Sequence, residues 1–352
     1  MRAAAAVGTP AESTSSRGTG YATASAADFD ASALRREVAC HAPVFARSVV
    51  VGTGPHAILP DASPARPDRI AALLAAIDAL ADDAAHAPPW CSVWVEHPDS
   101  DEGKGLSKLA RALQSRLDAM LRQSGRIEPG AGCRLHVFLA DGATAWVGTS
   151  DADATRWPMG IPRLRRAGPA PSRSAQKLAE AIVVFLGERE SELLRPGQRA
   201  VDLGAAPGGW TWVLASRGLK VVAVDNGPLK GEVAHDPLVR HLRADGLTWR
   251  PPRPVDWLVC DIVERPARIA EVVAAWMADG VARRAIFNLK LPMKKRYDEV
   301  RRCEGLIVER LRAAGIRATL SLRHLYHDRE EITGFVGGDE PGPRPSGAAG
   351  RR

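Results

Sequence analysis

The chain has 352 residues, of which 45% are hydrophobic and 25% are charged. This composition is sufficient to bury a full core and is typical of soluble globular proteins, and the length allows two to three domains. Lys and Arg outnumber Asp and Glu by 48 to 41, for a net charge of +7. A basic balance of this size is compatible with a polyanionic partner but does not require one.

Cysteine usage and the distribution of apolar residues bear on the compartment. The five cysteines contain no Cys-x-x-Cys pair, which favours reduced thiols in the cytoplasm and argues against a zinc site. The apolar run at residues 3–7 is too short for the core of a signal peptide, and no run approaches the roughly 20 apolar residues of a membrane-spanning helix. We therefore expect a cytoplasmic protein without membrane association, and we expect a monomer.

The first part of the chain predicts a small domain behind a disordered segment. Residues 1–33 are rich in Ala, Ser, Thr and Gly and bury too little surface to offset the entropy of ordering them. Residues 34–156 are predicted to form a compact α+β domain. The expected strands lie at 44–45, 48–51, 91–96, 135–139 and 145–148, and the expected helices begin at Asp68 and at Leu106.

The second of these helices has a basic face opposite its apolar one. That face is either a solvated surface or a contact for RNA phosphates, and the sequence alone does not decide between them. Nothing in the α+β domain suggests catalysis, so we expect it to capture substrate.

A basic, proline-rich stretch at 157–173 separates this domain from the next. Four prolines predict an extended linker, whose arginines either only connect the domains or also contact RNA backbone. Ser174 precedes a helix expected at 175–186 and is a candidate for its N-cap. Residues 174–336 form the second domain, and 337–352 are rich in Gly and Pro and are predicted to be disordered.

The central motif is a glycine-rich turn at 204–209. It follows an apolar run that ends at Asp202, precedes a helix that begins near Trp210, and is followed by a second apolar run that ends at Asp225. Such a turn lets backbone amides approach a nucleotide-like ligand, and an acid about 20 residues on can accept hydrogen bonds from both ribose hydroxyls. The spacing Gly-x-x-x-Gly-Gly is neither the dinucleotide fingerprint nor a P-loop. It resembles the first motif of class I methyltransferases that use S-adenosylmethionine.

Three further apolar runs, at 241–245, 255–261 and 285–290, also end in polar residues, and a helix is expected at 267–277. Alternating strands and helices predict an α/β fold with a parallel sheet, whose ligands bind beyond the carboxyl ends of the strands. A single carboxylate at such a position is more often a solvated strand end or a cap. Several should nevertheless meet at one rim: Asp202, Asp225, Asp245, Asp261 and Lys290.

Lys290 is the most distinctive of these residues. It lies among apolar neighbours in the sequence, and desolvation lowers the pKa of a lysine, as does a neighbouring cation. The sequence therefore predicts a neutral amine that acts as a general base.

Six motifs in order carry a resemblance to a known family. They are PSRSAQKL (171–178), DLGAAPGGW (202–210), VDNGP (224–228), VCDIVE (259–264), FNLKLPMKKRY (287–297) and LYHDREEI (325–332). Together they resemble the RlmM family within the RrmJ/fibrillarin-like group. That family methylates a ribose 2′-hydroxyl of a cytidine in 23S ribosomal RNA and carries an RNA-binding THUMP domain ahead of a Rossmann-like methyltransferase domain.

The resemblance implies a THUMP-like domain at 34–156, a class I methyltransferase domain at 174–336, 23S ribosomal RNA as partner and no metal. By motif, the residues expected to contact S-adenosylmethionine are Ser174, Ala206, Pro207, Gly208, Gly209, Asp225, Asp245 and Asp261. The group's Lys-Asp-Lys-Glu set corresponds to Lys177, Asp261 and Lys290, with Lys290 as proton acceptor, and is completed by Glu330 or Glu331. Strand alternation favours Glu331. The chain departs from the family in lacking its N-terminal apolar strand, and Ala206 stands where a cysteine is common.

Two alternatives stand beside this interpretation. One is a methyltransferase that acts on a base or on another RNA position, although no Asn-Pro-Pro-Tyr-like motif follows the run that ends at Asp261. The other is a catalytically silent RNA-binding protein on a methyltransferase scaffold, against which the presence of Lys177, Asp261 and Lys290 argues. The enzymatic interpretation requires Lys177 and Lys290 to meet in space.

Overall fold

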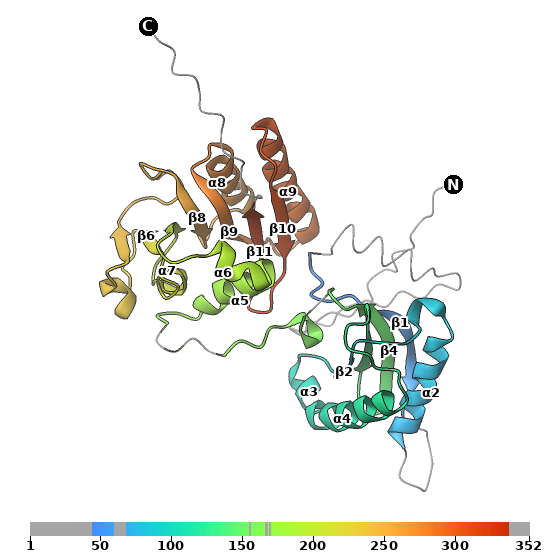
Figure 1. Cartoon of the computed structure of the whole chain (residues 1–352). Helices are drawn as coiled ribbons and strands as arrows, with labels where there is room; N and C mark the ends of the chain where they lie inside the picture. The colour runs from blue at the N-terminus through green and yellow to red at the C-terminus, as the bar shows by residue number, and fades with distance from the viewer. Residues whose placement is uncertain (1–43, 60–67, 155, 166–167, 169, 338–352) are drawn as a thin grey trace. The chain divides into compact units, whose positions relative to one another are not determined.

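The computed structural model describes residues 44–59, 68–154, 156–165, 168 and 170–337 (Figure 1). The segments predicted to be disordered lie outside these residues, apart from Gly337, which ends a strand. The described residues divide into two compact units, one of residues 48–160 and the other of residues 44–47 and 161–337. Within the described ranges, no helix is both long and apolar enough to cross a bilayer.

The first unit is a four-stranded sheet in the order β1-β4-β3-β2, which is antiparallel except for the β2–β3 pair. Helices α2 and α4 pack on it through a shared apolar core. The predicted Asp68 cap is confirmed, because its carboxylate accepts a hydrogen bond from the Ile70 amide at 3.1 Å. The elements are β1 (Val51–Ala57), α2 (Arg69–Ala81), η1 (Ala84–His86), β2 (Val93–Glu96), α3 (Asp101–Lys104), α4 (Ser107–Gln123), β3 (Cys133–Leu139), β4 (Thr144–Asp151) and η2 (Pro158–Gly160).

The start of this unit differs from the prediction. Residues 44–45 and 48–50 are not strands, and β1 begins only at Val51. Residues 44–47 belong to the second unit, where the Val44 carbonyl accepts a hydrogen bond from the His324 amide at 2.8 Å and the Phe45 ring packs on His324. Tertiary contacts of these apolar residues therefore override their strand propensity.

A buried polar chain links three strands of the first unit. His136 forms two hydrogen bonds, one between Nδ1 and Glu96 Oε2 at 2.7 Å and one between Nε2 and Ser150 Oγ at 2.9 Å. The other Glu96 oxygen accepts a hydrogen bond from the Met159 amide. Ser150 is only 3% exposed, so this Glu-His-Ser arrangement is out of reach of a substrate. It satisfies buried polar groups and ties η2 to the sheet.

The second unit contains a seven-stranded sheet in the order β10-β11-β9-β8-β5-β6-β7. The strands from β9 to β7 are parallel, and β11 runs antiparallel to β9 and β10. The predicted α/β fold is confirmed, and the weak strand near residue 241 is present. The strands are β5 (Arg199–Leu203), β6 (Lys220–Val224), β7 (Val239–Leu242), β8 (Val255–Cys260), β9 (Ala282–Lys290), β10 (Thr319–Arg323) and β11 (Glu331–Gly337).

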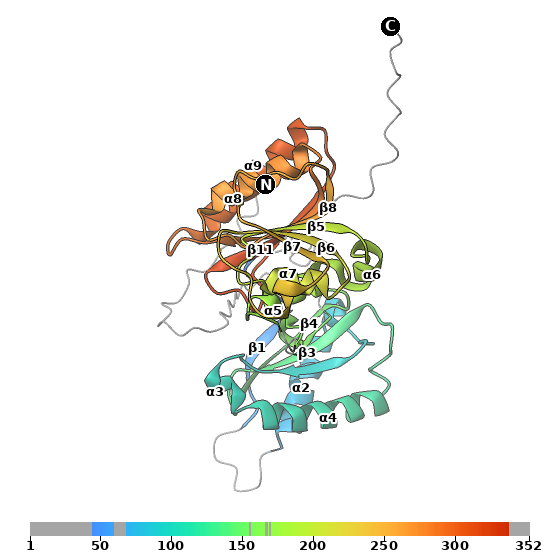
Figure 2. The ribbon, with the colours of Figure 1, turned by 90° about the vertical axis from the view of Figure 1, so that its left-hand side faces the viewer.

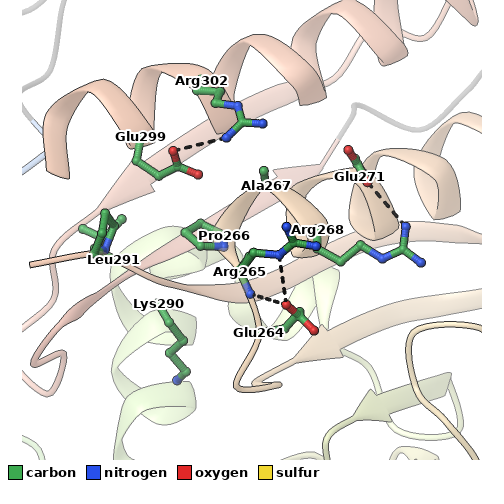
Figure 3. Close-up of a pocket in the computed structure, with 11 residues that line it drawn as sticks. Glu264, Arg265, Pro266, Ala267, Arg268, Glu271, Lys290, Leu291, Glu299 and Arg302 are labelled. Carbon is green, nitrogen blue, oxygen red and sulfur yellow. Dashed lines mark hydrogen bonds and ion pairs between the residues drawn. The ribbon is translucent and has the colours of Figure 1, made fainter. Parts of the chain in front are cut away.

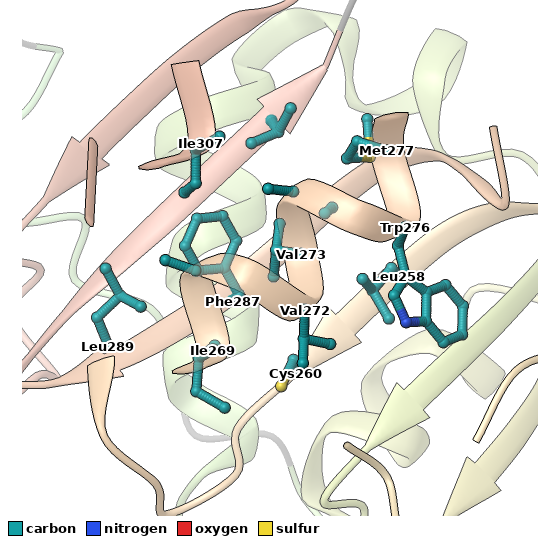
Figure 4. Packing of buried hydrophobic residues seen from close by; sticks show 14 of the residues in the cluster. Leu258, Cys260, Ile269, Val272, Val273, Trp276, Met277, Phe287, Leu289 and Ile307 are labelled. Atoms are coloured by element: carbon teal, nitrogen blue, oxygen red, sulfur yellow. The ribbon is translucent and has the colours of Figure 1, made fainter. Parts of the chain in front are cut away.

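Helices cover both faces of this sheet. Figure 2 shows α8 and α9 on one face and α5 and α7 on the other. The α8–α9 face is closed by a cluster that includes Trp276, Phe287 and Ile307, all essentially buried (Figure 4). The helical elements are α5 (Ala175–Leu186), η3 (Gly187–Arg189), α6 (Glu190–Leu193), α7 (Gly209–Ala215), η4 (Glu232–His235), α8 (Pro266–Ala278) and α9 (Arg296–Ala313). Burial on both faces explains why the central strands are almost wholly apolar up to their last residues.

Candidate active site

The glycine-rich turn connects β5 to α7 through a backbone that only glycine adopts easily. Gly204 and Gly208 have φ values of +79° and +112°. At Gly209, a Cβ atom would lie 2.3 Å from Ser172 Oγ and 2.4 Å from Ser174 Oγ. The absence of side chains therefore lets the segment before α5 close directly on the turn.

Ser174 lies at this contact but does not cap α5, contrary to the expected N-cap. Its hydroxyl forms a hydrogen bond with the Ser172 hydroxyl at 2.6 Å, and no side-chain hydrogen bond caps the helix. Its carbonyl accepts a hydrogen bond from Trp210 Nε1 at 3.0 Å. Ser174 thus joins α5 to the first residues of α7.

Asp225 ties the end of β6 to the turn. Its two carboxylate oxygens accept hydrogen bonds from the Ala206 amide at 2.9 Å and from the Gly227 amide at 2.7 Å. The loop that carries Asp245 lies alongside, since a Cβ atom on Gly246 would be 3.7 Å from the Gly204 amide. Asp245 itself is exposed and accepts a hydrogen bond from the Leu247 amide at 2.9 Å. Carboxylate acceptors beside a glycine turn fit the hydroxyls and amino group of an adenosine.

Asp202 does not belong to this rim. It is fully buried inside the sheet, where its Oδ2 accepts a hydrogen bond from Thr211 Oγ1 at 2.6 Å. Its Oδ1 has no hydrogen-bond partner within the described part of the chain. Burial raises the pKa of Asp202 to about 7, and the neighbouring Asp261 adds to the effect. The expectation that Asp202 lines the rim is therefore wrong, because the strand directs this side chain into the fold and not beyond its end.

Two lysines and two carboxylates form a cluster next to the turn. Lys177 on α5 donates to Glu331 Oε1, and Lys290 at the end of β9 donates to Glu331 Oε2. Lys290 also donates to Asp261 Oδ1 at 2.5 Å. The register of the antiparallel β9–β11 pair sets Glu331 directly opposite Lys290. The requirement that Lys177 and Lys290 meet is satisfied, since both bind one carboxylate. We call these four residues the lysine–carboxylate cluster.

Glu330, the other acid considered for this set, lies elsewhere. Its carboxylate pairs with Arg296 at the surface, and its side chain is 63% exposed. Glu331 is 5% exposed. Glu330 directly precedes β11, which begins at Glu331. Because side chains alternate along an extended chain, Glu331 points into the cluster and Glu330 points away from it.

The protonation of Lys290 differs from the sequence prediction. Burial lowers its pKa, but the charges and hydrogen bonds of Asp261 and Glu331 outweigh burial, so the pKa of Lys290 is raised above its ordinary value. For Glu331, burial works against ionisation, yet hydrogen bonds from both lysines lower its pKa. The Asp261 and Glu331 carboxylates thus favour the protonated form of Lys290. The lowered pKa expected from the sequence is wrong, because the apolar neighbours in sequence are not the groups that face the amine in space.

Buried polar residues behind the cluster hold Asp261 in place. Asn288 donates to Asp261 Oδ1 at 3.1 Å and accepts a hydrogen bond from Thr333 Oγ1 at 2.9 Å. Thr333 Oγ1 also lies 3.0 Å from both Asp328 oxygens. Burial raises the pKa of Asp328 to about 7. Sequence reasoning missed these supports, although a buried Asn within an apolar strand is itself a signal of a required hydrogen bond.

Glu180 is a second residue that the sequence analysis missed. It lies one helical turn after Lys177 on α5 and is only 1% exposed. Its carboxylate accepts hydrogen bonds from the Tyr326 amide at 2.7 Å and from the His327 amide at 2.9 Å, and it contacts His327 Nδ1 at 2.6 Å. Glu180 therefore anchors the loop that leads into β11. Its spacing from Lys177 indicates a shared helix face.

No group of three or more His, Cys, Asp or Glu residues in the described ranges is arranged to bind a metal ion.

Comparisons with known proteins agree with this geometry. Residues 170–301 match the model for FtsJ-like methyltransferases, and residues 68–151 match the model for the N-terminal region of ribosomal RNA large subunit methyltransferase M. A protein of that name from Laribacter hongkongensis is 51% identical over 268 residues, which cover 76% of this chain and 74% of the relative. One from Stenotrophomonas maltophilia is 49% identical over 309 residues, or 86% of this chain and 83% of the relative. The resemblance noted from the motifs is confirmed, and the chain belongs to the ribosomal RNA large subunit methyltransferase M family.

Proposed function

We propose that this protein transfers a methyl group from S-adenosylmethionine to the ribose 2′-hydroxyl of a cytidine in 23S ribosomal RNA, with Lys290 as the proton acceptor. The observation that carries the proposal is the lysine–carboxylate cluster beside the glycine-rich turn. Family membership supports a ribosomal RNA substrate, because the relatives are named as large-subunit ribosomal RNA methyltransferases. The 2′-oxygen as acceptor rests on the paired amines, which suit a hydroxyl that must lose a proton.

The cofactor is proposed to lie along the turn. When bound, it supplies a methyl group on a positively charged sulfonium. Backbone at the glycines approaches it closely, and the carboxylates of Asp225 and Asp245 accept hydrogen bonds from its hydroxyl and amino groups. The full proposed contact set is Ser174, Ala206, Pro207, Gly208, Gly209, Asp225, Asp245 and Asp261, and no metal is needed.

In the proposed reaction the ribose oxygen attacks the methyl carbon in line with the carbon–sulfur bond. The new oxygen–carbon bond forms as the carbon–sulfur bond breaks, the electron pair of that bond goes to sulfur, and the hydroxyl proton goes to Lys290. Positioning supplies much of the rate, because the methyl group is already activated. General-base assistance is typically worth about 10²–10⁴-fold.

Lys290 must lose a proton before it can accept one. In the free protein Asp261 and Glu331 raise its pKa. The positive charge of the bound methyl donor, together with Lys177 on the same carboxylate, opposes that effect and favours the neutral amine. We infer that the bound donor promotes formation of the base, which couples proton abstraction to the presence of the methyl group.

The remaining assignments follow from the same proposal. The domain at 34–156 would be THUMP-like and would capture RNA. Arg163, Arg165, Arg166 and Arg173 of the 157–173 linker would contact RNA backbone, and residues 174–336 would be the methyltransferase domain. The protein would act as a cytoplasmic monomer. A silent RNA-binding protein has no observation in its favour, since each member of the lysine–carboxylate cluster is present and paired.

The test uses ribosomal RNA that lacks the modification, labelled S-adenosylmethionine, and the variant Lys290→Ala. We expect the variant to bind the cofactor within about threefold of wild type by calorimetry and to lose about 10²–10⁴-fold in transfer rate. Nucleoside analysis of the wild-type product should yield 2′-O-methylcytidine. Lys220→Ala, at the opposite end of a parallel strand, is the control and should retain full activity. Full activity of Lys290→Ala would remove Lys290 from the mechanism, and a base-methylated nucleoside would refute the proposed acceptor.

A further inference from the structure

A pocket of about 630 Å³ adjoins Lys290 on the side of α8 and α9 (Figure 3). Its walls come from the start of α8, the residues that follow β9 and the first turns of α9. None of the glycine-rich turn lines it, so it is separate from the proposed cofactor position. Of the lysine–carboxylate cluster, only Lys290 contributes to its lining.

The inner wall of this pocket is apolar. It is formed by the buried Pro266 and Ala267 at the start of α8 and by the buried Leu291, which directly follows Lys290; the exposed Pro292 lines the pocket further out. Aliphatic groups of this kind can pack by van der Waals contact against the face of a nucleobase. The volume lies within the range of pockets that hold one ligand of nucleotide size.

The rim of the pocket carries three arginines, and the three glutamates with which they form long ion pairs, Glu264, Glu271 and Glu299, also line it. Arg265, Arg268 and Arg302 lie 3.6, 3.5 and 3.5 Å from their glutamate partners. These distances exceed those of good charge-assisted hydrogen bonds, which are about 2.7–2.9 Å. The arginine side chains are 46% to 87% exposed. Their donors are therefore available to an incoming anion, and a guanidinium binds phosphate oxygens in a bidentate manner.

We propose that this pocket binds the nucleotide that directly adjoins the methylated ribose in the RNA strand. Its base would lie against the Pro266–Leu291 wall, and its phosphate would contact the arginine rim. The inference rests on the proposed function, because Lys290 marks where the reacting ribose lies. Since Lys290 itself contributes to the lining of the pocket, an occupant of the pocket lies next to that ribose. Gripping the neighbouring nucleotide would hold the 2′-hydroxyl in position for attack.

The first test measures RNA binding and turnover of the double variant Arg268→Ala/Arg302→Ala. We expect the KM for ribosomal RNA to rise about tenfold or more and cofactor affinity to stay unchanged. The slope of log K against log salt should fall by about 0.7–0.9, the contribution of the one phosphate contact that is lost. The matched control is Arg310→Ala/Arg312→Ala at the other end of α9, where Arg310 also has an exposed ion pair of 3.5 Å. Equal KM values and salt slopes in the two double variants would overturn the proposal.

The second test asks which nucleotide occupies the pocket. Arg265, whose side chain is 87% exposed, is replaced by the photo-crosslinking residue p-benzoylphenylalanine, and the cross-link is mapped on the same RNA as the methyl group. We expect the cross-link within one nucleotide of the methylated position, and the same replacement at Arg310 should give none there. Ribose methylation with a distant cross-link would overturn the pocket assignment alone. A wild-type protein that leaves ribose unmethylated would overturn the proposed function and this inference together.

Discussion

Replacing Glu331 with glutamine tests the electrostatics of the lysine–carboxylate cluster directly. Glu331 is 5% exposed and accepts hydrogen bonds from Lys177 and Lys290 through different oxygens. The substitution keeps the shape of the side chain but removes the negative charge between the two ammonium groups. One lysine then faces an amide NH₂ group, which cannot accept a hydrogen bond. We therefore expect the pKa of Lys290 to fall in Glu331→Gln.

The size of the shift follows from the burial of the pair. An opposite charge within about 4–6 Å shifts a pKa by about 1–3 units, and the Lys290 side chain is 23% exposed, so solvent screens the pair only in part. Asp261, which binds Lys290 at 2.5 Å in the wild-type protein, is unchanged in the variant. It therefore keeps part of the elevation of the Lys290 pKa. The elevation that remains in the variant comes from Asp261 alone, so the pKa of Lys290 should lie lower in Glu331→Gln than in the wild type.

The measurement is an NMR titration of protein labelled with ¹³C at lysine Cε, with the Lys290 signal assigned from its loss in Lys290→Arg. It requires no activity and no cofactor, so it separates the charge effect from loss of catalysis. Glu330→Gln is the matched control, because Glu330 is adjacent in sequence but pairs with Arg296 at the surface. An unchanged Lys290 midpoint in Glu331→Gln, or an equal fall in Glu330→Gln, would refute the electrostatic account.

Two further outcomes test groups buried behind the site. The pKa of Asp202 is raised to about 7, so its contribution to stability is complete below the unfolded-state value of 3.8 and is lost as the pH rises through 7. Between about pH 5 and pH 9 the free energy of unfolding of the wild-type protein in urea should fall by about 3 kcal/mol from this group, and Asp202→Asn should lack that fall. Parallel pH profiles of the two proteins would contradict this. Glu180→Gln should lose at least one buried hydrogen bond to the loop before β11, at a cost of about 2–3 kcal/mol, and should slow methyl transfer because Glu331 follows that loop. The exposed Glu192→Gln should alter neither measurement.

The sequence by itself determined the features that depend on local pattern. Period-2 and period-3.6 spacing predicted α2, α4, β2, β3 and β4 in the first unit and β5 to β9 with α5, α7 and α8 in the second. The apolar runs also predicted that Asp202, Asp225, Asp245, Asp261 and Lys290 meet at one edge, which is wrong for the buried Asp202. Such patterns are readable because each element must bury one face, whatever its neighbours are. The order of the six motifs also identified the family.

Only the tertiary structure decided the features that depend on contacts distant in sequence. The β9–β11 register selects Glu331 over Glu330, and it joins residues 41 positions apart. The charge state of Lys290 depends on the same contact, since its sequence neighbours predict a lowered pKa and its spatial neighbours raise it. The placement of residues 44–47 with the second unit likewise depends on His324. Electrostatic and packing energies depend on distance in space, so these properties follow from the fold and not from local spacing.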